Sequence, residues 1–286
     1  MALDLTGTGI WSRELRWWPD RAEAAAAAGE LEQLGYSALW FPGGDAHGAF
    51  DAASELLRAT SSVTVATGIL SVWVADPEVV AAERSELHDA YDGRFLLGLG
   101  ISHAPQVGTD RYKRPLEKMR TFLESLDVAA PPVLPEARAL AALGPKMLAL
   151  AAERSLGAHP YLVTPEHTRT AREAVGPEKL VAPEQAVVLE RDPDRARALA
   201  RGHLEHYLRL PNYTNNWRRL GFGDEDLAGA GSDRLVDALV AWGDEEAIAA
   251  RVREHLAAGA DHVPVQPIGP DPVDSLRRLA PALLDL

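Results

Sequence analysis

A serine and a histidine stand at the end of an apolar run that has the length of a buried strand. Residues 94–105 read RFLLGLGISHAP, and Ser102 and His103 follow the glycines near the end of the run. A histidine titrates near neutral pH, so His103 could move a proton or donate a hydrogen bond to a ligand. The alternative is that His103 only caps a backbone group. Its role therefore depends on the fold around this run.

The surrounding sequence alternates short β-branched or aromatic runs with Ala-, Leu-, Glu- and Arg-rich stretches of helical length. This alternation is typical of βα units around a parallel sheet. The predicted strands lie within residues 8–12, 37–41, 63–70, 94–105, 139–143, 158–164, 184–190 and 262–268. Eight strands separated by helices favour an α/β fold, a (β/α)8 TIM barrel, formed as a single domain over residues 1–286.

The active site of such a barrel is built from residues that follow the C-terminal ends of the strands. Those that the sequence places there and that we select as candidates are Trp11, Asp45, His47, Gly68, Ile69, Gly100, Ser102, His103, His159 and Thr164. We expect Trp11, Asp45 and His47 to contact a substrate. For Asp45 and His47 the alternative is a solvated loop.

One long connection, residues 211–231, shows no regular pattern and is interpreted as a candidate lid, because long structureless loops are usually functional or mobile. Trp217 is its expected substrate contact, with Tyr213, Asn215 and Asn216 offering further stacking and amide contacts. The alternative is that these side chains pack the segment onto the barrel.

Bulk properties exclude several classes of function. The chain has 286 residues, a net charge of −13 and no cysteine. The acidic balance argues against nucleic acid or an anionic membrane as partner, and the lack of cysteine excludes disulfides and thiolate chemistry. We see neither a signal peptide nor an apolar run long enough to cross a membrane, so we expect a cytoplasmic protein with a small-molecule ligand.

Standard catalytic motifs are missing from the sequence, which contains no HExxH, GxSxG, P-loop or EF-hand pattern. His203 and His206 have a spacing that metal ligands can have, but the charged helix that carries them is expected to lie far from the strand ends. No metal site is therefore predicted.

Three stretches together resemble a known family. Residues 59–105 (ATSSVTVATGILSVWVADPEVVAAERSELHDAYDGRFLLGLGISHAP) contain a T-G-hydrophobic strand end, a proline-started helix and the pattern GRF-x-L-G-x-G. Residues 144–168 and 231–263 are also similar to this family. The resemblance is to the bacterial luciferase-like family, especially its branch of oxidoreductases that use the deazaflavin coenzyme F-420. It implies a TIM barrel with the cofactor at the mouth.

The resemblance also implies roles for individual residues. Gly68-Ile69 matches a non-prolyl cis peptide in a bulge behind the cofactor ring. Gly100 would let the backbone approach the cofactor, and Ser102 would donate to its ribityl or phosphate part. His103 matches a glutamate that is proposed as proton donor in some relatives, so it is the predicted catalytic residue.

The phosphate of the cofactor is expected near a helix start at residues 164–168, where backbone N–H groups attract anions. Thr164 and Thr168 are the predicted contacts, with His159 from the preceding strand end also assigned to the cofactor; Glu166 opposes an anion there, and simple capping by Thr164 is the alternative. A basic stretch could contact the anionic tail of the cofactor, or it could be a solvated helix start. It consists of Arg111, Lys113 and Arg114.

Two departures from the family pattern leave the activity open. The first is His103 itself, which stands where some relatives have a glutamate. The second follows the second strand, where relatives often place an Asp-His pair, whereas residues 41–48 read FPGGDAHG. The leading hypothesis is an F-420-dependent oxidoreductase; the alternatives are an FMN-dependent monooxygenase, a non-catalytic flavin-binding barrel and a metal-dependent hydrolase. Family members are often dimers, and the run VVAAERSELHDAY would suit a homodimer contact or packing on the barrel. The sequence does not indicate the substrate.

Overall fold

A parallel sheet forms the centre of the protein in the computed structural model, which describes residues 3, 5–18, 20–44 and 46–286 but not the side chains of 46 and 47. The order of its strands is β10-β9-β11-β1-β2-β3-β5-β6-β7-β8, with β4 paired to β5. The strands are β1 (Gly7–Trp11), β2 (Ala38–Phe41), β3 (Thr64–Thr67), β4 (Leu70–Ser71), β5 (Phe95–Gly100), β6 (Arg138–Leu140), β7 (Gly157–Ala158), β8 (Leu180–Val181), β9 (Gln185–Val188), β10 (Val240–Trp242) and β11 (His262–Pro267).

The segment that contains β8 and β9 joins the two ends of this sheet. β8 pairs with β7, whereas β9 pairs with β11, which in turn pairs with β1. Between them, Glu184 N still donates to Pro160 O at 2.9 Å. Counted as one bent strand, β8 and β9 complete an eight-stranded barrel with β1, β2, β3, β5, β6, β7 and β11.

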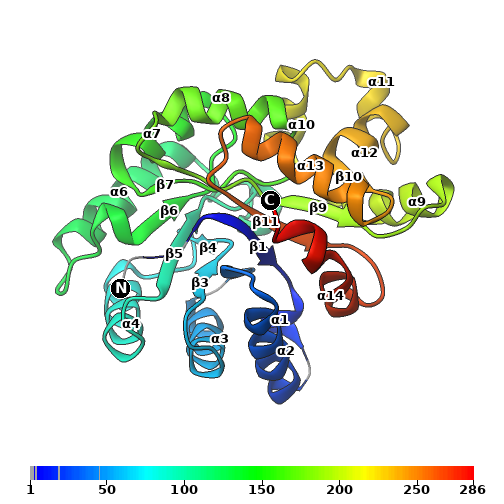
Figure 1. Ribbon diagram of the computed structural model, residues 1–286. Coiled ribbons are helices and arrows are strands. Elements are labelled where there is room, and N and C mark those ends of the chain that lie inside the picture. The colour runs from blue at the N-terminus through cyan, green and yellow to red at the C-terminus, as the bar shows by residue number, and fades with distance from the viewer. Residues whose placement is uncertain (1–2, 4, 19, 45) are drawn as a thin grey trace.

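Helices surround the outside of the barrel, with α2, α3, α4 and α14 on one side of it and α7, α8 and α13 on the opposite side (Figure 1). Many of them begin at a proline, and Asp76 caps α4 by accepting hydrogen bonds from Glu78 N and Val79 N. The helices are α1 (Glu14–Trp17), α2 (Arg21–Leu34), α3 (Ala46–Ala59), α4 (Pro77–Ala90), α5 (Ala104–Val107), α6 (Pro115–Val128), α7 (Pro145–Arg154), α8 (Pro165–Val175), α9 (Pro193–Leu204), α10 (Pro211–Arg219), α11 (Asp224–Leu227), α12 (Asp233–Leu239), α13 (Glu245–Ala257) and α14 (Pro272–Leu283), with 3-10 turns η1 (Pro135–Ala137) and η2 (Tyr207–Arg209).

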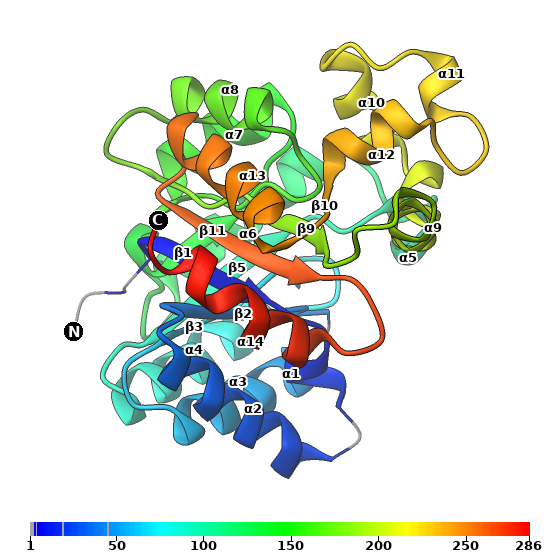
Figure 2. The same ribbon diagram turned by 45° about the vertical axis from the view of Figure 1, so that its right-hand side comes forward.

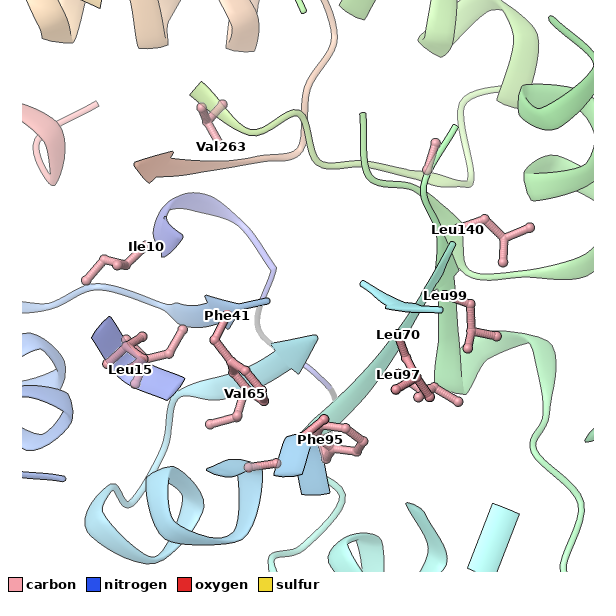
Figure 3. Close-up of a cluster of buried hydrophobic side chains, with 14 of the residues drawn as sticks. Ile10, Leu15, Phe41, Val65, Leu70, Phe95, Leu97, Leu99, Leu140 and Val263 are labelled. Atoms are coloured by element: carbon pink, nitrogen blue, oxygen red, sulfur yellow. The ribbon is translucent and has the colours of Figure 1, made fainter. Parts of the chain in front are cut away.

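The main hydrophobic core lies between the strands and the helices. Alternate residues of β5 show the pattern, because Phe95, Leu97 and Leu99 belong to this core whereas Leu96 faces the barrel interior. Figure 3 shows this core with ten side chains labelled, carried mainly by β1, β2, β3, β5, β6 and β11.

The barrel interior contains a fully buried tryptophan with several small residues around it. Trp40 is fully buried and shares its cluster with the alanines Ala38, Ala66, Ala139 and Ala182. Its indole Nε1 donates to His262 Nε2 at 3.1 Å, and His159 stacks on it with ring centroids 4.3 Å apart. The small strand residues thus leave the volume that this tryptophan occupies.

The predicted (β/α)8 fold is confirmed, while several predicted strand limits are wrong. The strand expected over 158–164 is only β7, because the chain leaves the sheet after Ala158, and the strand expected over 139–143 is the three-residue β6. β8 and β10 were not predicted; each is too short to show an alternating pattern. In the part of the chain that the structure describes, no helix combines the length and the apolar character needed to cross a membrane.

Candidate active site

A cavity of about 740 Å³ opens among the residues that follow the C-terminal ends of the strands. In Figure 2 the arrowheads of β9 and β11 point to the side of the molecule on which α5 and α9 lie. Of the predicted site residues, seven line this cavity: Trp11, Gly68, Ile69, Gly100, Ser102, His103 and His159. The structure therefore brings together side chains that are up to 148 positions apart in the sequence, counted from Trp11 to His159.

Gly68 and Ile69 interrupt the third strand, which ends as β3 at Thr67 and resumes as β4 at Leu70. A Cβ on Gly68 would lie 2.2 Å from Trp11 Nε1, so only glycine leaves room for this indole. The expected cis peptide between Gly68 and Ile69 is wrong: the cis bond found in the described chain is Ala130-Pro131. A non-prolyl cis bond costs about 3 kcal/mol, and here the break in the strand is made with a trans bond.

Gly100 lines the cavity, as expected, and also packs against Ile69. A Cβ on residue 100 would lie 2.4 Å from Ile69 Cδ1, so only glycine leaves room for the isoleucine side chain. Ser102 has a φ of 51°, in the left-handed region that few non-glycine residues adopt. Its hydroxyl donates to Gln106 Oε1 at 3.0 Å. The strained turn at Ser102 comes directly before His103, at the rim of the cavity.

His103 is half-buried and is held by the helix α10. Its Nδ1 lies 3.1 Å from Asn212 Oδ1, and its ring contacts that of Tyr213 with centroids 5.4 Å apart. Burial lowers the pKa of His103, and the hydrogen bond to Asn212 opposes this shift only in part. The imidazole is therefore mainly neutral at pH 7, with Nδ1–H donating to the amide oxygen and the lone pair on Nε2.

An aromatic wall, which we define as Trp11, Tyr161, Tyr207 and Tyr213, runs along the cavity toward His103. Neighbouring rings in it lie 5.0 to 5.5 Å apart, from Trp11 to Tyr161, on to Tyr207 and on to Tyr213. The Tyr207 hydroxyl donates to that of Tyr161 at 3.1 Å, and Tyr161 donates to Gln266 Oε1 at 2.8 Å. Tyr161 and Tyr207 were not predicted; only the position of Tyr161 after a strand end pointed to the site.

His203 and His206 also line the cavity, so their predicted place on a remote outer helix is wrong. The C-terminal end of α9 reaches the cavity, where His203 Nε2 lies 3.4 Å from the Tyr161 hydroxyl and His206 Nε2 lies 3.4 Å from Gln106 Nε2. Burial lowers the pKa of His203 to about 4. Within the described residues, no three histidine, aspartate or glutamate side chains come close enough together to hold a metal ion.

His159 is buried in the wall of the cavity. Its Nδ1 is 2.7 Å from the Ala182 carbonyl, which can only accept, so the proton of the neutral ring is on Nδ1. Burial lowers the pKa of His159 to about 4 despite this bond. His159 is therefore a neutral imidazole in the cavity wall at pH 7.

Arg219 provides positive charge on the side of the cavity that α7 borders. A Cβ on Gly144, the residue before this ten-residue helix, would lie 3.6 Å from an Arg219 guanidinium nitrogen, and no side chain caps the helix. Backbone N–H groups at a helix start and a guanidinium both favour anions. Gly144 and Arg219 were not predicted as a pair because they come from elements 75 positions apart, counted from their numbers.

Three predicted contacts lie outside the cavity. Thr168 is fully buried and its hydroxyl lies 2.7 Å from His255 Nδ1. Thr164 precedes α8 and borders a separate surface depression instead. Trp217 is buried and donates from Nε1 to Leu162 O at 3.0 Å. It therefore packs residues 211–231 onto the barrel, which was the alternative to a substrate contact.

The predicted lid is not irregular, since residues 211–231 contain the helices α10 and α11. Of its other predicted contacts, Tyr213 and Asn215 line the cavity, whereas Asn216 is buried with its Oδ1 on Arg219. Asp45 and the side chain of His47 lie outside the described residues. Arg111, Lys113 and Arg114 do not border the cavity, and Arg114 forms an ion pair with Glu117.

Comparison with known proteins gives a family match and a set of similar folds. Residues 4–262 match the family described as luciferase-like monooxygenase. Among curated proteins, no sequence matches this chain.

Solved structures of similar fold include enzymes with two different cofactors. An F-420-dependent secondary alcohol dehydrogenase in complex with an F-420-acetone adduct has a TM-score of 0.70 and 17% identity, with 98% of this chain and 99% of that chain covered. The coenzyme F-420-dependent tetrahydromethanopterin reductase from Methanopyrus kandleri has a TM-score of 0.73, 16% identity and the same coverage. The oxygenating constituent of 3,6-diketocamphane monooxygenase from Pseudomonas putida, in complex with FMN, has a TM-score of 0.67 and 15% identity, with 96% of each chain covered.

Proposed function

Because this chain belongs to the luciferase-like monooxygenase family, we propose that it is an oxidoreductase that uses coenzyme F-420 and exchanges a hydride with a small organic substrate. Two of the structures of similar fold are named as F-420-dependent enzymes, which supports this choice of cofactor. The observation that carries the proposal is the position of His103, hydrogen-bonded to Asn212, in the lining of a cavity walled by aromatic rings.

The cavity fits a planar cofactor with an anionic tail. Its volume of about 740 Å³ is within the range of small-molecule sites, and its lining alternates glycine backbone with the aromatic wall. Flat surfaces of this kind suit a fused ring system. We assign the tail to Gly144 and Arg219, where a helix start and a guanidinium both favour negative charge.

Bound coenzyme F-420 supplies a ring carbon that accepts or releases a hydride. His103 is left to move the proton. In the oxidation of a secondary alcohol, the coenzyme would take the hydride from the substrate carbon and His103 Nε2 would take the hydroxyl proton, so that the carbon–oxygen bond becomes a carbonyl. The reverse reaction returns this proton from His103 to the carbonyl oxygen. Asn212 keeps the Nε2 lone pair available by accepting from Nδ1–H.

A second candidate is an FMN-dependent monooxygenase. The description of the family and the FMN complex of the diketocamphane enzyme favour it. The same cavity serves both candidates, because deazaflavin and flavin share the shape of their rings.

Fluorescence titrations of the purified protein with coenzyme F-420 and, in parallel, with FMN test the proposal. We expect micromolar or tighter binding of coenzyme F-420 and weaker binding of FMN. Preference for FMN would move the assignment to the monooxygenase, and binding of neither would overturn both.

The role of His103 is tested with the loaded enzyme and a panel of secondary alcohols, followed by the loss of deazaflavin absorbance. We expect His103→Ala to bind the cofactor with a Kd within about threefold of the wild type and to lose about 10²- to 10⁴-fold in rate, the usual contribution of general acid–base catalysis. An unchanged rate would exclude His103 as the group that moves the proton.

A further inference from the structure

The described lining of the cavity contains two arginines and no carboxylate. In the whole chain acidic residues outnumber basic ones by 42 to 29, yet none of the described residues that line the cavity is an aspartate or a glutamate. The arginines are Arg13 and Arg219. Positive charge on the walls of a cavity concentrates anions there. The lining therefore favours ligands with negative charge.

The two arginines belong to different sides of the barrel. Arg13 follows β1, and Arg219 lies beside Gly144, which follows β6. In the closed order β1-β2-β3-β5-β6-β7-β8/β9-β11, β1 and β6 are four positions apart in either direction, so their ends lie on opposite sides of the cavity. Because Gly144 and Arg219 are assigned to the tail of the cofactor, Arg13 is available for a second anionic group.

The guanidinium of Arg13 has no partner for its N–H groups. Among the residues that the structure describes, it forms neither a hydrogen bond nor an ion pair. The next acidic residue, Glu14, accepts from a serine hydroxyl at 2.6 Å instead, and Arg21 on the same connection is paired with Glu55. Arg13 is thus an exposed cation in the cavity lining that no described carboxylate neutralises.

Trp17 holds this guanidinium by one face. The guanidinium carbon of Arg13 lies over the indole, 5.3 Å from the ring centroid, and Trp17 itself is 53% exposed and lines the cavity. A guanidinium that stacks on a ring keeps the N–H groups along its edge, and two of them match the two oxygens of a carboxylate. The arrangement suits a planar anion better than a neutral group.

The tyrosines of the aromatic wall separate Arg13 from His103. Burial raises the pKa of Tyr207, and the charge of Arg13 opposes this rise, so the guanidinium acts on this end of the wall. Tyr207 contacts Tyr213, which contacts His103, with ring centroids 5.0 and 5.4 Å apart. A substrate that reaches both Arg13 and His103 therefore spans these rings, and its anionic group lies several bonds from the carbon that reacts.

We propose that Arg13 binds the carboxylate of the substrate, and that the substrate is a hydroxy acid whose secondary alcohol lies several carbons from this carboxylate. The inference rests on the proposed function. The alcohol carbon passes a hydride to the coenzyme and the hydroxyl proton passes to His103 Nε2, which leaves the oxo acid; the carboxylate does not react. Because Arg13 holds it equally before and during the reaction, loss of Arg13 should raise KM more than it lowers kcat.

The test compares two probes of equal length that differ in charge, 5-hydroxyhexanoate and 5-hydroxyhexanamide. Their oxidation with coenzyme F-420 is measured for the wild type and for Arg13→Gln, which removes the charge and keeps N–H donors. Arg209→Gln is the matched control, because Arg209 is exposed, is paired with Glu205 and does not border the cavity.

We expect the wild type to prefer the acid to the amide about tenfold or more in kcat/KM. Arg13→Gln should raise KM for the acid about 10- to 100-fold, the usual effect of losing a hydrogen bond to a charged group, and leave the kinetics of the amide unchanged. Arg209→Gln should change neither. Equal losses on both probes in Arg13→Gln, or no loss, would overturn the inference while turnover still supported the proposed function.

The tail of coenzyme F-420 also carries carboxylates, so its binding is measured with the same variant. We expect the Kd of coenzyme F-420 to stay within about threefold of the wild type in Arg13→Gln. A loss of affinity for coenzyme F-420 that is absent with 8-hydroxy-5-deazariboflavin, which has the ring without the tail, would assign Arg13 to the cofactor and overturn the inference.

Binding of hexanoate to the protein without cofactor tests Arg13 independently of turnover. Isothermal titration should give a Kd for hexanoate that rises about tenfold or more in Arg13→Gln, with hexanamide binding the two proteins equally. Failure of the wild type to bind coenzyme F-420 would overturn the proposed function, and this titration would still decide on Arg13. Equal binding of hexanoate by both proteins, or none by the wild type, would overturn its assignment to a carboxylate.

Discussion

Gly68 decides where the largest side chain at the cavity's inner end lies. The indole Nε1 of Trp11 occupies the position that a Cβ on residue 68 would need, at 2.2 Å. Through Trp11 this single glycine shapes the wall of the cavity.

We expect Gly68→Ala to push Trp11 aside and to lower the free energy of unfolding by about 1 to 3 kcal/mol, the usual cost of overpacking. It should also weaken deazaflavin binding more than tenfold. Urea unfolding and fluorescence titration measure the two effects. The matched control for stability is Gly202→Ala, where a new Cβ meets nothing within 4 Å and alanine favours the helix α9. Equal stability of the two variants would contradict the packing seen around Gly68.

The helix α10 brings residues from the C-terminal half of the chain to the cavity. It contributes Asn212 and Tyr213 to the contacts of His103, and Trp217 anchors it through Leu162 O. Tyr213 and Trp217 both belong to a separate hydrophobic cluster with α9 and α12. Burial lowers the pKa of His103, and the hydrogen bond from this helix raises it, so the position of α10 affects the protonation of a residue on a different element.

We expect Asn212→Ala to lower the pKa of His103 further below its usual range, because the hydrogen bond from Nδ1 to Asn212 raises this pKa against the effect of burial. An NMR titration of the His103 ring follows the change directly. Asn215→Ala, on the same helix and also at the cavity, is the control and should leave the pKa of His103 where it is. A rise of this pKa in Asn212→Ala would show that the amide does not accept from the ring.

Buried titratable groups give the whole molecule an unusual dependence of stability on pH. Burial lowers the pKa of His159 and His203 to about 4 each and that of His255 to about 3, and it raises the pKa of Glu184 to about 8. Below pH 6.5 the unfolded chain binds protons on these histidines that the native protein excludes, so stability falls as pH drops toward 4. Native Glu184 keeps a proton that the unfolded chain releases above pH 4.5, so its contribution falls as pH rises to 8.

We expect the free energy of unfolding to be highest near pH 6.5 and to drop on both sides. On the alkaline side the drop from Glu184 is up to about 2 kcal/mol between pH 6.5 and 8, since one pH unit corresponds to about 1.4 kcal/mol per proton. Urea unfolding at pH 5, 6.5 and 8 measures this. Glu184→Gln should be equally stable at pH 6.5 and 8 and should keep the acidic limb; a persistent alkaline drop would assign it to other groups.

The order of apolar runs and helical stretches along the chain determined the barrel, because the periodicity of a strand or helix is a local property of the sequence. The same local reading placed Trp11, Gly68, His103 and His159 at strand ends, where the cavity is found. Tertiary contacts decided which other side chains line the cavity beside these four residues. His103 meets Asn212 across 109 positions, and Thr168 is turned away from the cavity to His255 across 87. The direction in which a helical residue points depends on how its helix packs, and the packing of α8, α9 and α10 against the barrel rests on buried contacts between distant elements that no local pattern records.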